Sequence, residues 1–497
     1  MQFKLEETTI ADIHAAFRAG TLDSATLTQM YLDRISAYDQ DGPVLNAFIT
    51  LNPDAVAEAR KLDEAFASGG KFVGPLHGIP IAIKDQAEIK GLEASFGSIA
   101  LKGYVATEDA TIVTKLREAG AVIIGKTTMP DFAASWWGFG SVHGETKCPY
   151  ALDRDSGGSS GGTGSAIAAN LAAVGIGEDT GGSIRLPSSA NNLVGIRVTP
   201  GMISRKGLSP LLVPLDTAGP MARTVTDAAI VLDTLVGYDP ADPYTCAVAV
   251  ADHKGSYTRH LEAGALKGAR LGVLKEAFGS DDDPDCAQVN TVVRKAIEQM
   301  ADAGAELVEL SLPGLADYIA ETSLYISRSR TDVNRFLKQR PSLAHTALET
   351  IVEAELYHKG LELIPALIEE GPEDFADDPE YFRKAVLGVE FQQIILNMIA
   401  ANALDGLCYP ACQVLTPTHE ALRSGRWTVL SYPTNTTIAS QSRIPSICVP
   451  AGFSDTGVPV GMEIVAPPYH EPDLIRLGYA FEQLTHWRKP PVSAPPL

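Results

Sequence analysis

A segment rich in glycine and serine, residues 155–199, carries the side chains in this sequence that are best suited to covalent chemistry. It holds nine glycines and five serines before Pro187, and an apolar helix and strand are predicted inside it, at 166–173 and 174–177. A flexible linker would not contain such regular elements. Glycine clusters beside regular elements let backbone N–H groups approach a ligand, and serines within them are candidate nucleophiles. The segment therefore predicts a nucleophilic site.

Two shorter glycine patterns point to other chemistry, and their surroundings argue against both. Residues 120–127 fit the phosphate-loop formula, but the residues between the two glycines form an apolar strand rather than a flexible loop. Residues 157–161 fit the G-x-S-x-G elbow of α/β-hydrolases, but polar residues precede them where that elbow needs an apolar strand. Neither nucleotide binding nor a hydrolase elbow is predicted.

Four motifs resemble those of the amidase signature family. They are HGIPIAIKD at 77–85, GGSSGG at 157–162, DTGGSIRLP at 179–187 and GPMARTV at 219–225. The intervals of 75 residues from Lys84 to Ser159 and of 24 residues from Ser159 to Ser183 are typical of that family. The resemblance extends from the N-terminal helices to residues 461–463 and is weakest at 239–405.

The resemblance implies a Ser–Ser–Lys triad that works without a cofactor or a metal. Ser183 is the expected nucleophile, which attacks an amide carbonyl and becomes acylated. Ser159, which follows a cis peptide bond in the family, is expected to relay the proton to the base, Lys84. The oxyanion hole is expected from the backbone N–H groups of Thr180, Gly181, Gly182 and Ser183. The expected supporting residues are Ser160, Asp179 and Arg185. The last two are expected to form a buried pair that holds the loop.

Lys84 can act as a base only in its neutral form. The reference pKa of lysine is about 10.4, and burial lowers it because it disfavours the charged form. Lys84 follows the apolar residues 81–83, and the end of a buried strand suits such a shift. The ten histidines include none in a convincing motif with these serines, and His77 is interpreted as structural.

Three aromatic residues are candidates for the substrate pocket: Trp136, Trp137 and Phe139. In relatives this stretch approaches the acyl pocket, but core packing would explain the three rings equally well. The chain departs from the family at Cys148, where asparagine is common, and at Asp131, where glutamate is frequent. Neither departure is expected to touch the triad, but both are expected to alter the pocket.

These residues need a large sheet to bring them together. Short apolar runs alternate with amphipathic helices from residue 78 onward and return at 404–408, 444–449 and 458–465. This alternation predicts an α/β fold, with a single large domain whose mixed β-sheet core is flanked by helices on both faces. The whole chain, 1–497, is then one amidase domain. Its expected parts are N-terminal helices at 1–70, a signature core at 75–235, a variable helical insertion or cap at 239–405, and C-terminal strands and a helix at 406–487 that return to the core sheet.

Composition limits the partners and the location. Lys and Arg number 40 against 61 Asp and Glu, and the resulting net charge of −21 disfavours nucleic acid as a partner. The chain has no apolar stretch long enough to span a membrane and no secretory signal, so a cytoplasmic location is predicted. Cys408 and Cys412 are the only close cysteine pair, and no further ligands lie near them, so no metal is expected.

The sequence thus predicts a serine amidohydrolase that acts on linear amides. It would cleave a carboxamide C–N bond through a Ser183 acyl-enzyme and release a carboxylic acid with ammonia or an amine. The expected partner is a small-molecule amide substrate, and a homodimer stays open. The alternative is the catalytic subunit of a transfer-RNA-dependent amidotransferase, which nothing in the sequence excludes. Aliphatic, aryl and peptide amides, esters and carbamates all stay open as substrates.

Overall fold

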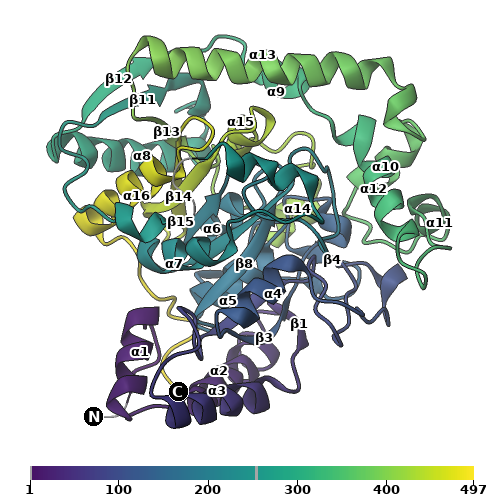
Figure 1. Ribbon diagram of the computed structural model, residues 1–497. Helices are drawn as coiled ribbons and strands as arrows, with labels where there is room; N and C mark the ends of the chain where they lie inside the picture. The colour runs from purple at the N-terminus through teal and green to yellow at the C-terminus, as the bar shows by residue number, and fades with distance from the viewer. Residues whose placement is uncertain (1–2, 252–255) are drawn as a thin grey trace.

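A computed structural model describes residues 3–251 and 256–497 of the chain, and within these residues eleven strands form one mixed sheet (Figure 1). The strands, in their order across the sheet, are β1 (Phe48–Leu51), β3 (Val122–Thr127), β2 (Pro80–Lys84), β8 (Val174–Asp179), β10 (Thr217–Ala222), β9 (Val194–Arg197), β14 (Ser446–Phe453), β15 (Pro459–Val465), β13 (Gly406–Pro410), β11 (Arg270–Leu274) and β12 (Glu306–Leu310). The pairs β3–β2, β2–β8, β13–β11 and β11–β12 are parallel, and the other neighbours are antiparallel. Two short hairpins lie outside this sheet: β4 (Phe139–Gly140) with β5 (Gly144–Glu145), and β6 (Lys147–Cys148) with β7 (Ala151–Asp155).

Helices cover both faces of the sheet. In β14, the Ile447 side chain lies against Gly478 of α16. The side chain of the next residue, Cys448, lies against Gly461 of β15, on the face where Ser189 of α6 also packs. Successive strand residues point to opposite faces, so α16 and α6 lie on opposite sides of the sheet. The helices are α1 (Ile10–Ala19), α2 (Ser24–Arg34), α3 (Ala55–Gly69), α4 (Thr111–Glu118), α5 (Gly161–Ala168), α6 (Arg185–Ala190), α7 (Val225–Leu235), α8 (Pro284–Asp302), α9 (Leu315–Glu321), α10 (Tyr325–Lys338), α11 (Leu348–Glu353), α12 (Leu363–Glu369), α13 (Pro379–Ala401), α14 (His419–Arg423), α15 (Thr436–Gln441) and α16 (Glu471–Thr485).

The predicted α/β fold with one large mixed sheet is confirmed. Residues 80–222 supply five adjacent strands, residues 406–465 supply three more, and the pairing of β9 with β14 joins the two groups. A capping box begins α1, because Thr9 N–H donates to Asp12 Oδ2 at 3.0 Å and Asp12 N–H donates to Thr9 Oγ1 at 3.2 Å. Gly20 ends this helix in the left-handed conformation, with a φ of 66°.

Two of the expected parts contain more strand than the sequence suggested. The N-terminal segment 1–70 includes β1 at one edge of the sheet, and the first half of 239–405 includes β11 and β12 at the other edge. Within 239–405, the part without strands begins at α9, whereas α8 lies between β11 and β12. β12 carries exposed Glu306 and Glu309, as an edge strand often carries charge, and these residues obscured the apolar alternation that marks a strand.

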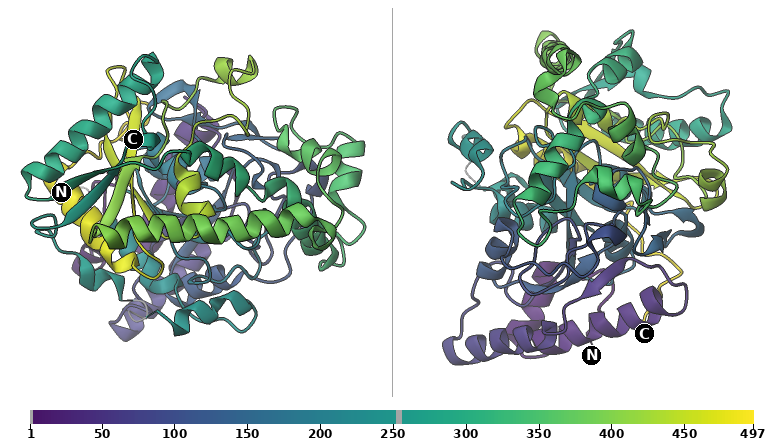
Figure 2. Two further views of the ribbon diagram at one scale, coloured as in Figure 1. Left: turned by 90° about the horizontal axis from the view of Figure 1, so that it is seen from above. Right: turned by 90° about the vertical axis from the view of Figure 1, so that its right-hand side faces the viewer.

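The remaining helical segment, α9 to α13, lies near the loop that carries Ser183, at the end of strand β8. Figure 2 shows α13 lying across one end of the molecule, while α1, α2 and α3 lie at the opposite end. The C-terminal residues run beside these N-terminal helices, where the buried Arg34 guanidinium donates to the carbonyl oxygens of Ala494 and Pro495 at 2.9 Å. None of the helices in the described ranges combines the length and the apolar surface that crossing a lipid bilayer requires.

Candidate active site

The ends of two neighbouring parallel strands place the predicted base. β2 pairs in parallel with β8. Lys84, the last residue of β2, therefore lies at the same end of the strands as Glu178 and Asp179, which end β8. After β8 the chain turns through residues 180–184 into α6. The loop before α5, which carries Ser159, reaches the same end of these strands. Lys84 and the loops that carry Ser159 and Ser183 therefore lie close together.

Lys84 and Ser159 form a buried hydrogen-bonded pair. Lys84 Nζ donates to Ser159 Oγ at 2.7 Å and to the carbonyl oxygen of Glu178 at 3.1 Å. The peptide bond between Gly158 and Ser159 is cis, as the resemblance implies. Lys84 is 2% exposed and Ser159 is fully buried. Burial lowers the pKa of Lys84, and the Glu178 carboxyl acts in the opposite direction.

Ser160 joins the loop that carries Ser159 to the loop that carries Ser183. Its backbone N–H donates to the carbonyl oxygen of Ser183 at 3.1 Å, and its hydroxyl donates to the carbonyl oxygen of Glu178 at 3.2 Å. The structure therefore brings the three predicted triad residues to one site. Ser183 lies on the wall of a cavity, whereas Ser159 and Lys84 lie behind it.

The turn before Ser183 needs its two glycines. Gly182 has a φ of 145° and lies against the Thr436 side chain, and Gly181 lies against the Tyr325 hydroxyl, so a side chain at either position would collide with its neighbour. No described residue accepts a hydrogen bond from the backbone N–H groups of the four predicted oxyanion donors, Thr180, Gly181, Gly182 and Ser183. These four amide groups are thus available in the turn that carries the Ser183 hydroxyl.

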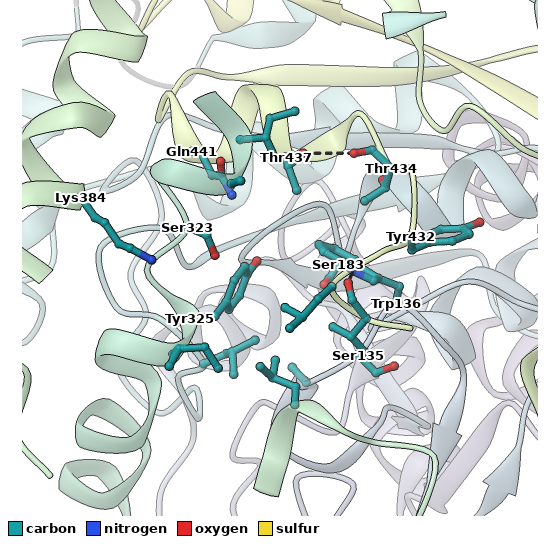
Figure 3. A pocket seen from close by; sticks show the side chains of 18 residues that line it. Ser135, Trp136, Ser183, Ser323, Tyr325, Lys384, Tyr432, Thr434, Thr437 and Gln441 are labelled. Atoms are coloured by element: carbon teal, nitrogen blue, oxygen red, sulfur yellow. Dashed lines mark hydrogen bonds between the residues drawn. The ribbon is translucent and has the colours of Figure 1, made fainter. Parts of the chain in front are cut away.

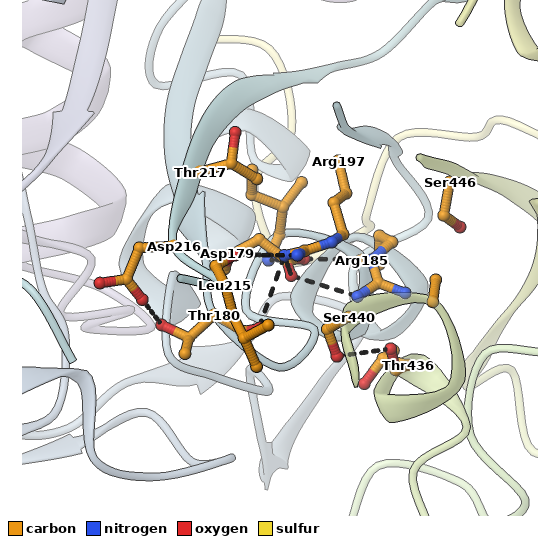
Figure 4. A network of polar contacts seen from close by, with 12 residues as sticks. Asp179, Thr180, Arg185, Arg197, Leu215, Asp216, Thr217, Thr436, Ser440 and Ser446 are labelled. Atoms are coloured by element: carbon orange, nitrogen blue, oxygen red, sulfur yellow. Dashed lines mark hydrogen bonds and ion pairs between the residues drawn. The ribbon is translucent and has the colours of Figure 1, made fainter. Parts of the chain in front are cut away.

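A buried cluster of charges holds this turn in place (Figure 4). Asp179 accepts hydrogen bonds from Arg185 at 3.1 Å, from Arg197 at 2.7 Å and from the Ile184 N–H at 3.1 Å. Arg185 also pairs with Glu463 at 2.7 Å. Burial raises the pKa of Asp179, but the two guanidinium groups outweigh burial and bring this pKa to about 2. The expected pair of Asp179 and Arg185 is therefore part of a larger cluster, and the sequence analysis missed Arg197 and Glu463.

Glu178 and Asp216 are two further buried carboxyl groups that the sequence analysis missed. Glu178 Oε2 lies 3.5 Å from Lys84 Nζ, and Thr180 Oγ1 donates to Asp216 Oδ1 at 2.6 Å. Asp216 also accepts from the backbone N–H of Leu212 at 3.1 Å. Burial, with Asp216 adding to it, raises the pKa of Glu178 to about 8. An acidic residue at the end of an apolar strand was the sequence signal that could have pointed to Glu178.

The cavity at Ser183 has a volume of about 310 Å³ (Figure 3). Its floor and walls come from the serine loops, from α9, α10, α12 and α13, and from residues 429–441. The lining residues are Ala133, Ser135, Trp136, Ser183, Leu211, Ile319, Ala320, Ser323, Tyr325, Ile326, Leu363, Lys384, Val429, Leu430, Tyr432, Thr434, Thr437 and Gln441. In Figure 3, Lys384 reaches in from the side opposite Ser183. The helical segment that follows β12 therefore closes the cavity.

Only one of the three predicted pocket aromatics lines this cavity. Trp136 does so, and its Nε1–H donates to the carbonyl oxygen of Val429 at 2.7 Å. Trp137 instead packs edge-to-face against Tyr432, with ring centroids 4.6 Å apart, and Phe139 packs against two histidine rings. The core-packing interpretation therefore holds for Trp137 and Phe139, because the chain turns their side chains away from Ser183.

The two departures from the family pattern do not alter the lining of the cavity. Asp131 is buried and accepts hydrogen bonds from both the N–H and the hydroxyl of Ser141. Cys148 is buried and donates through Sγ to the carbonyl oxygen of Ala190 at 3.4 Å. Both side chains find their partners within the protein and neither lines the cavity, so an effect of either residue on the pocket would have to act through its neighbours.

Among residues 3–251 and 256–497 there is no group of three or more His, Cys, Asp or Glu side chains that could hold a metal ion. Cys408 and Cys412 are both buried, and their thiols donate to the carbonyl oxygens of Gly272 and Pro433.

Comparison with known proteins agrees with this geometry. The sequence profile of the amidase family matches residues 26–475. The chain belongs to the amidase signature family. It is 34% identical to the A subunit of glutamyl-tRNA(Gln) amidotransferase from Chromohalobacter salexigens over 497 residues, which cover 97% of this chain and 98% of that protein. The corresponding protein from Geobacter metallireducens is 33% identical over 508 residues, with the same coverage.

Solved amidase structures share the fold over nearly the whole chain. The native peptide amidase from Stenotrophomonas maltophilia superimposes with a TM-score of 0.86 at 34% identity, covering 98% of each chain. An amidase family protein from Bacillus anthracis gives a TM-score of 0.85 at 29% identity, covering 98% of this chain and 92% of the other. The amidase fold thus includes the helices that close the cavity.

The charge cluster behind the turn leads to a prediction about stability. Asp179→Asn removes the carboxylate that compensates two buried guanidinium groups, so the free energy of unfolding should fall by about 3–5 kcal/mol. Urea denaturation followed by circular dichroism measures this loss. The same change in an exposed ion pair, Asp281→Asn opposite Arg294, should leave the denaturation midpoint in place. Equal midpoints for the two variants would contradict a stabilising role of the cluster.

Proposed function

We propose that this protein hydrolyses the C–N bond of carboxamides through an acyl-enzyme on Ser183, with Ser159 as the proton relay and Lys84 as the base. The observation that carries the proposal is the 2.7 Å hydrogen bond between Lys84 Nζ and Ser159 Oγ in a buried site. An amide is a poor electrophile, and a serine hydroxyl is hardly ionised at neutral pH, so the reaction needs a base within hydrogen-bonding reach. A neutral lysine supplies one.

During acylation, protons move from Ser183 through Ser159 to Lys84 and then back to the leaving nitrogen. Neutral Lys84 accepts the proton of Ser159 while Ser159 accepts that of Ser183, and Ser183 Oγ forms a bond to the amide carbon. The N–H groups of residues 180–183 would bind the resulting oxyanion, and one such donor contributes about 3 kcal/mol to the transition state. The proton then returns through Ser159 to the nitrogen, the C–N bond breaks, and ammonia or an amine leaves.

Deacylation uses the same groups in reverse order. Water attacks the acyl ester, its proton passes through Ser159 to Lys84, and the Ser183 oxygen leaves with a proton that comes back along this route. The carboxylic acid is released and both serines regain their hydroxyl hydrogens. Every proton transfer in the cycle uses these three side chains, so the proposed mechanism includes no cofactor.

The lining of the cavity favours a small amide whose acyl part is apolar. Among the described lining residues, apolar and aromatic side chains predominate, Lys384 is the only charged one, and there is no Asp or Glu. Glutamine, the natural amide donor for an amidotransferase, carries an α-ammonium group that would find no carboxylate there. The lining therefore supports an amidase that acts alone on a small-molecule amide. A cytoplasmic location stays a prediction.

The alternative, the catalytic subunit of a transfer-RNA-dependent amidotransferase, is supported by the sequence relatives. Two proteins named as the A subunit of glutamyl-tRNA(Gln) amidotransferase are 33–34% identical over 97% of this chain. Such a protein would work with partner proteins. The two functions differ in their need for a partner, for ATP and for glutamine, and each of these differences can be measured.

The nucleophile is tested by covalent labelling. A sulfonyl fluoride should add once to the wild-type protein, and peptide mass spectrometry should place the adduct on Ser183, because this hydroxyl lies on the cavity wall. Ser183→Ala should abolish amide turnover and labelling while the circular dichroism spectrum is unchanged. Ser135→Ala, which removes another cavity hydroxyl, should keep both. An adduct on Ser135 or Ser160 would refute the assignment of Ser183.

The substrate class is tested with the purified chain alone. Without ATP or a partner, kcat/KM for an apolar carboxamide such as phenylacetamide should exceed that for free glutamine by about 100-fold or more, because an unpaired ammonium would have to enter the apolar cavity. Ammonia release measures both rates. A protein that hydrolyses glutamine best, or that works only with added partner proteins, would support the amidotransferase function instead.

A further inference from the structure

The proposed mechanism does not use the carboxyl group that lies beside its base. Glu178 Oε2 is 3.5 Å from Lys84 Nζ, and both side chains are nearly inaccessible, at 3% and 2% exposure. The other contact of this carboxyl group is weak, a hydrogen bond of 3.4 Å from Thr180 Oγ1 to Oε1. Lys84 is thus the cation within ion-pair distance of Glu178, while Asp216 is the carboxyl group with the larger electrostatic effect on it.

A second cavity reaches this pair from behind. It has a volume of about 390 Å³, and its lining includes Glu178 and Asp216, whereas Ser183 belongs only to the first cavity. Arg335, which is half-exposed, lies at its outer part, so the second cavity meets the surface. The second cavity therefore approaches Glu178 from a side that does not include Ser183.

The fixed charges of the second cavity are already paired. Arg205 pairs with Asp242 at 2.7 Å, and Arg328 pairs with Asp332 at 2.8 Å. These residues therefore do not form a binding site for an anion. The group in the lining that stands next to the catalytic machinery is Glu178.

We propose that Glu178 is a positioning residue that sets the charge of Lys84. The proposal rests on the proposed function, because it assigns Lys84 as the base. The two side chains share one proton in the neutral range. With the proton on Glu178, Lys84 is neutral and accepts a proton from Ser159; with the proton on Lys84, the base is blocked.

The surroundings make the two groups compete for this proton. Burial lowers the pKa of Lys84 and raises that of Glu178 to about 8, so the two values converge. The charged groups that face Glu178 are Lys84, Asp216, Asp179 and Arg197. The negative charges of Asp216 and Asp179 favour protonated Glu178, and the positive charge of Arg197 opposes them. Burial also raises the pKa of Asp216, so this carboxyl group titrates together with Glu178 and affects how the proton is divided between Glu178 and Lys84.

Glu178→Gln tests the proposal, because glutamine has the shape of the protonated acid and cannot ionise. Without the ion-paired, blocked form, the acid limb of the pH profile of kcat/KM for an amide should move to lower pH by about one unit or more. Glu178→Asp keeps the carboxyl group but places it one methylene farther from Lys84. The acid limb of this variant should therefore lie between those of the wild type and Glu178→Gln.

A control comes from Glu482, a half-buried glutamate on α16 that accepts a hydrogen bond from the Val225 N–H. Glu482→Gln should reproduce the wild-type pH profile, because this residue lies outside the catalytic site. Thermal denaturation of each variant shows whether it is folded. If Glu178→Gln does not fold, the acid limb of the Glu178→Asp variant still shows whether the pH profile moves to lower pH.

Deacylation tests the same effect in the second half of the reaction. Because Lys84 serves as the base again, the pH profile of deacylation should show the same displacement in Glu178→Gln. A displacement in acylation alone would contradict an effect of Glu178 on the charge of Lys84. Superimposed profiles for wild type and Glu178→Gln would overturn the inference, while Ser183 labelling and amide turnover by the wild type would still uphold the proposed function.

Discussion

The hydrogen bond between buried Lys84 and Ser159 is the contact on which the rest of the site depends. It places an amine next to a hydroxyl at 2.7 Å in surroundings that disfavour a charged lysine. The bond exists because parallel strands β2 and β8 end at the same edge of the sheet, and because the loop before α5 brings Ser159 to that edge. The sheet therefore both buries the lysine and aligns it, and these two conditions together let a lysine act as a base.

The cost of this arrangement is a concentration of ionisable groups in the protein interior. Asp179, Arg185, Arg197 and Glu463 pair with one another, so the turn that carries Ser183 is held by charges that compensate each other. Glu178, which lies 3.5 Å from Lys84, and Asp216, which accepts a hydrogen bond from Thr180, are less fully compensated. The interior is thus divided into a cluster of paired charges that stabilises the turn and a cluster of titrating groups that can govern the protonation of Lys84.

The sequence contained enough information for the fold and for the three residues of the proposed triad. Apolar runs such as 81–83 and 174–177 revealed buried strands, because a strand covered on both faces must be apolar throughout. The sequence could not reveal β12, whose exposed glutamates suit an edge, nor the inward or outward direction of Trp137 and Phe139, which depends on the turn of the backbone around them. Long-range partners such as Glu463 and Arg185 are separated by most of the chain, and only the folded sheet brings them together.

The central claim is that a neutral lysine at position 84 activates the serines, and the rate of Ser183 acylation as a function of pH tests it most directly. Rapid-quench measurement with an activated ester avoids any need to protonate the leaving group. The wild-type rate should rise with pH to a plateau, and Lys84→Arg should lose several orders of magnitude at every pH, because arginine stays protonated over the accessible range. A Lys84→Arg protein that is correctly folded and acylates within tenfold of the wild-type rate would contradict the account.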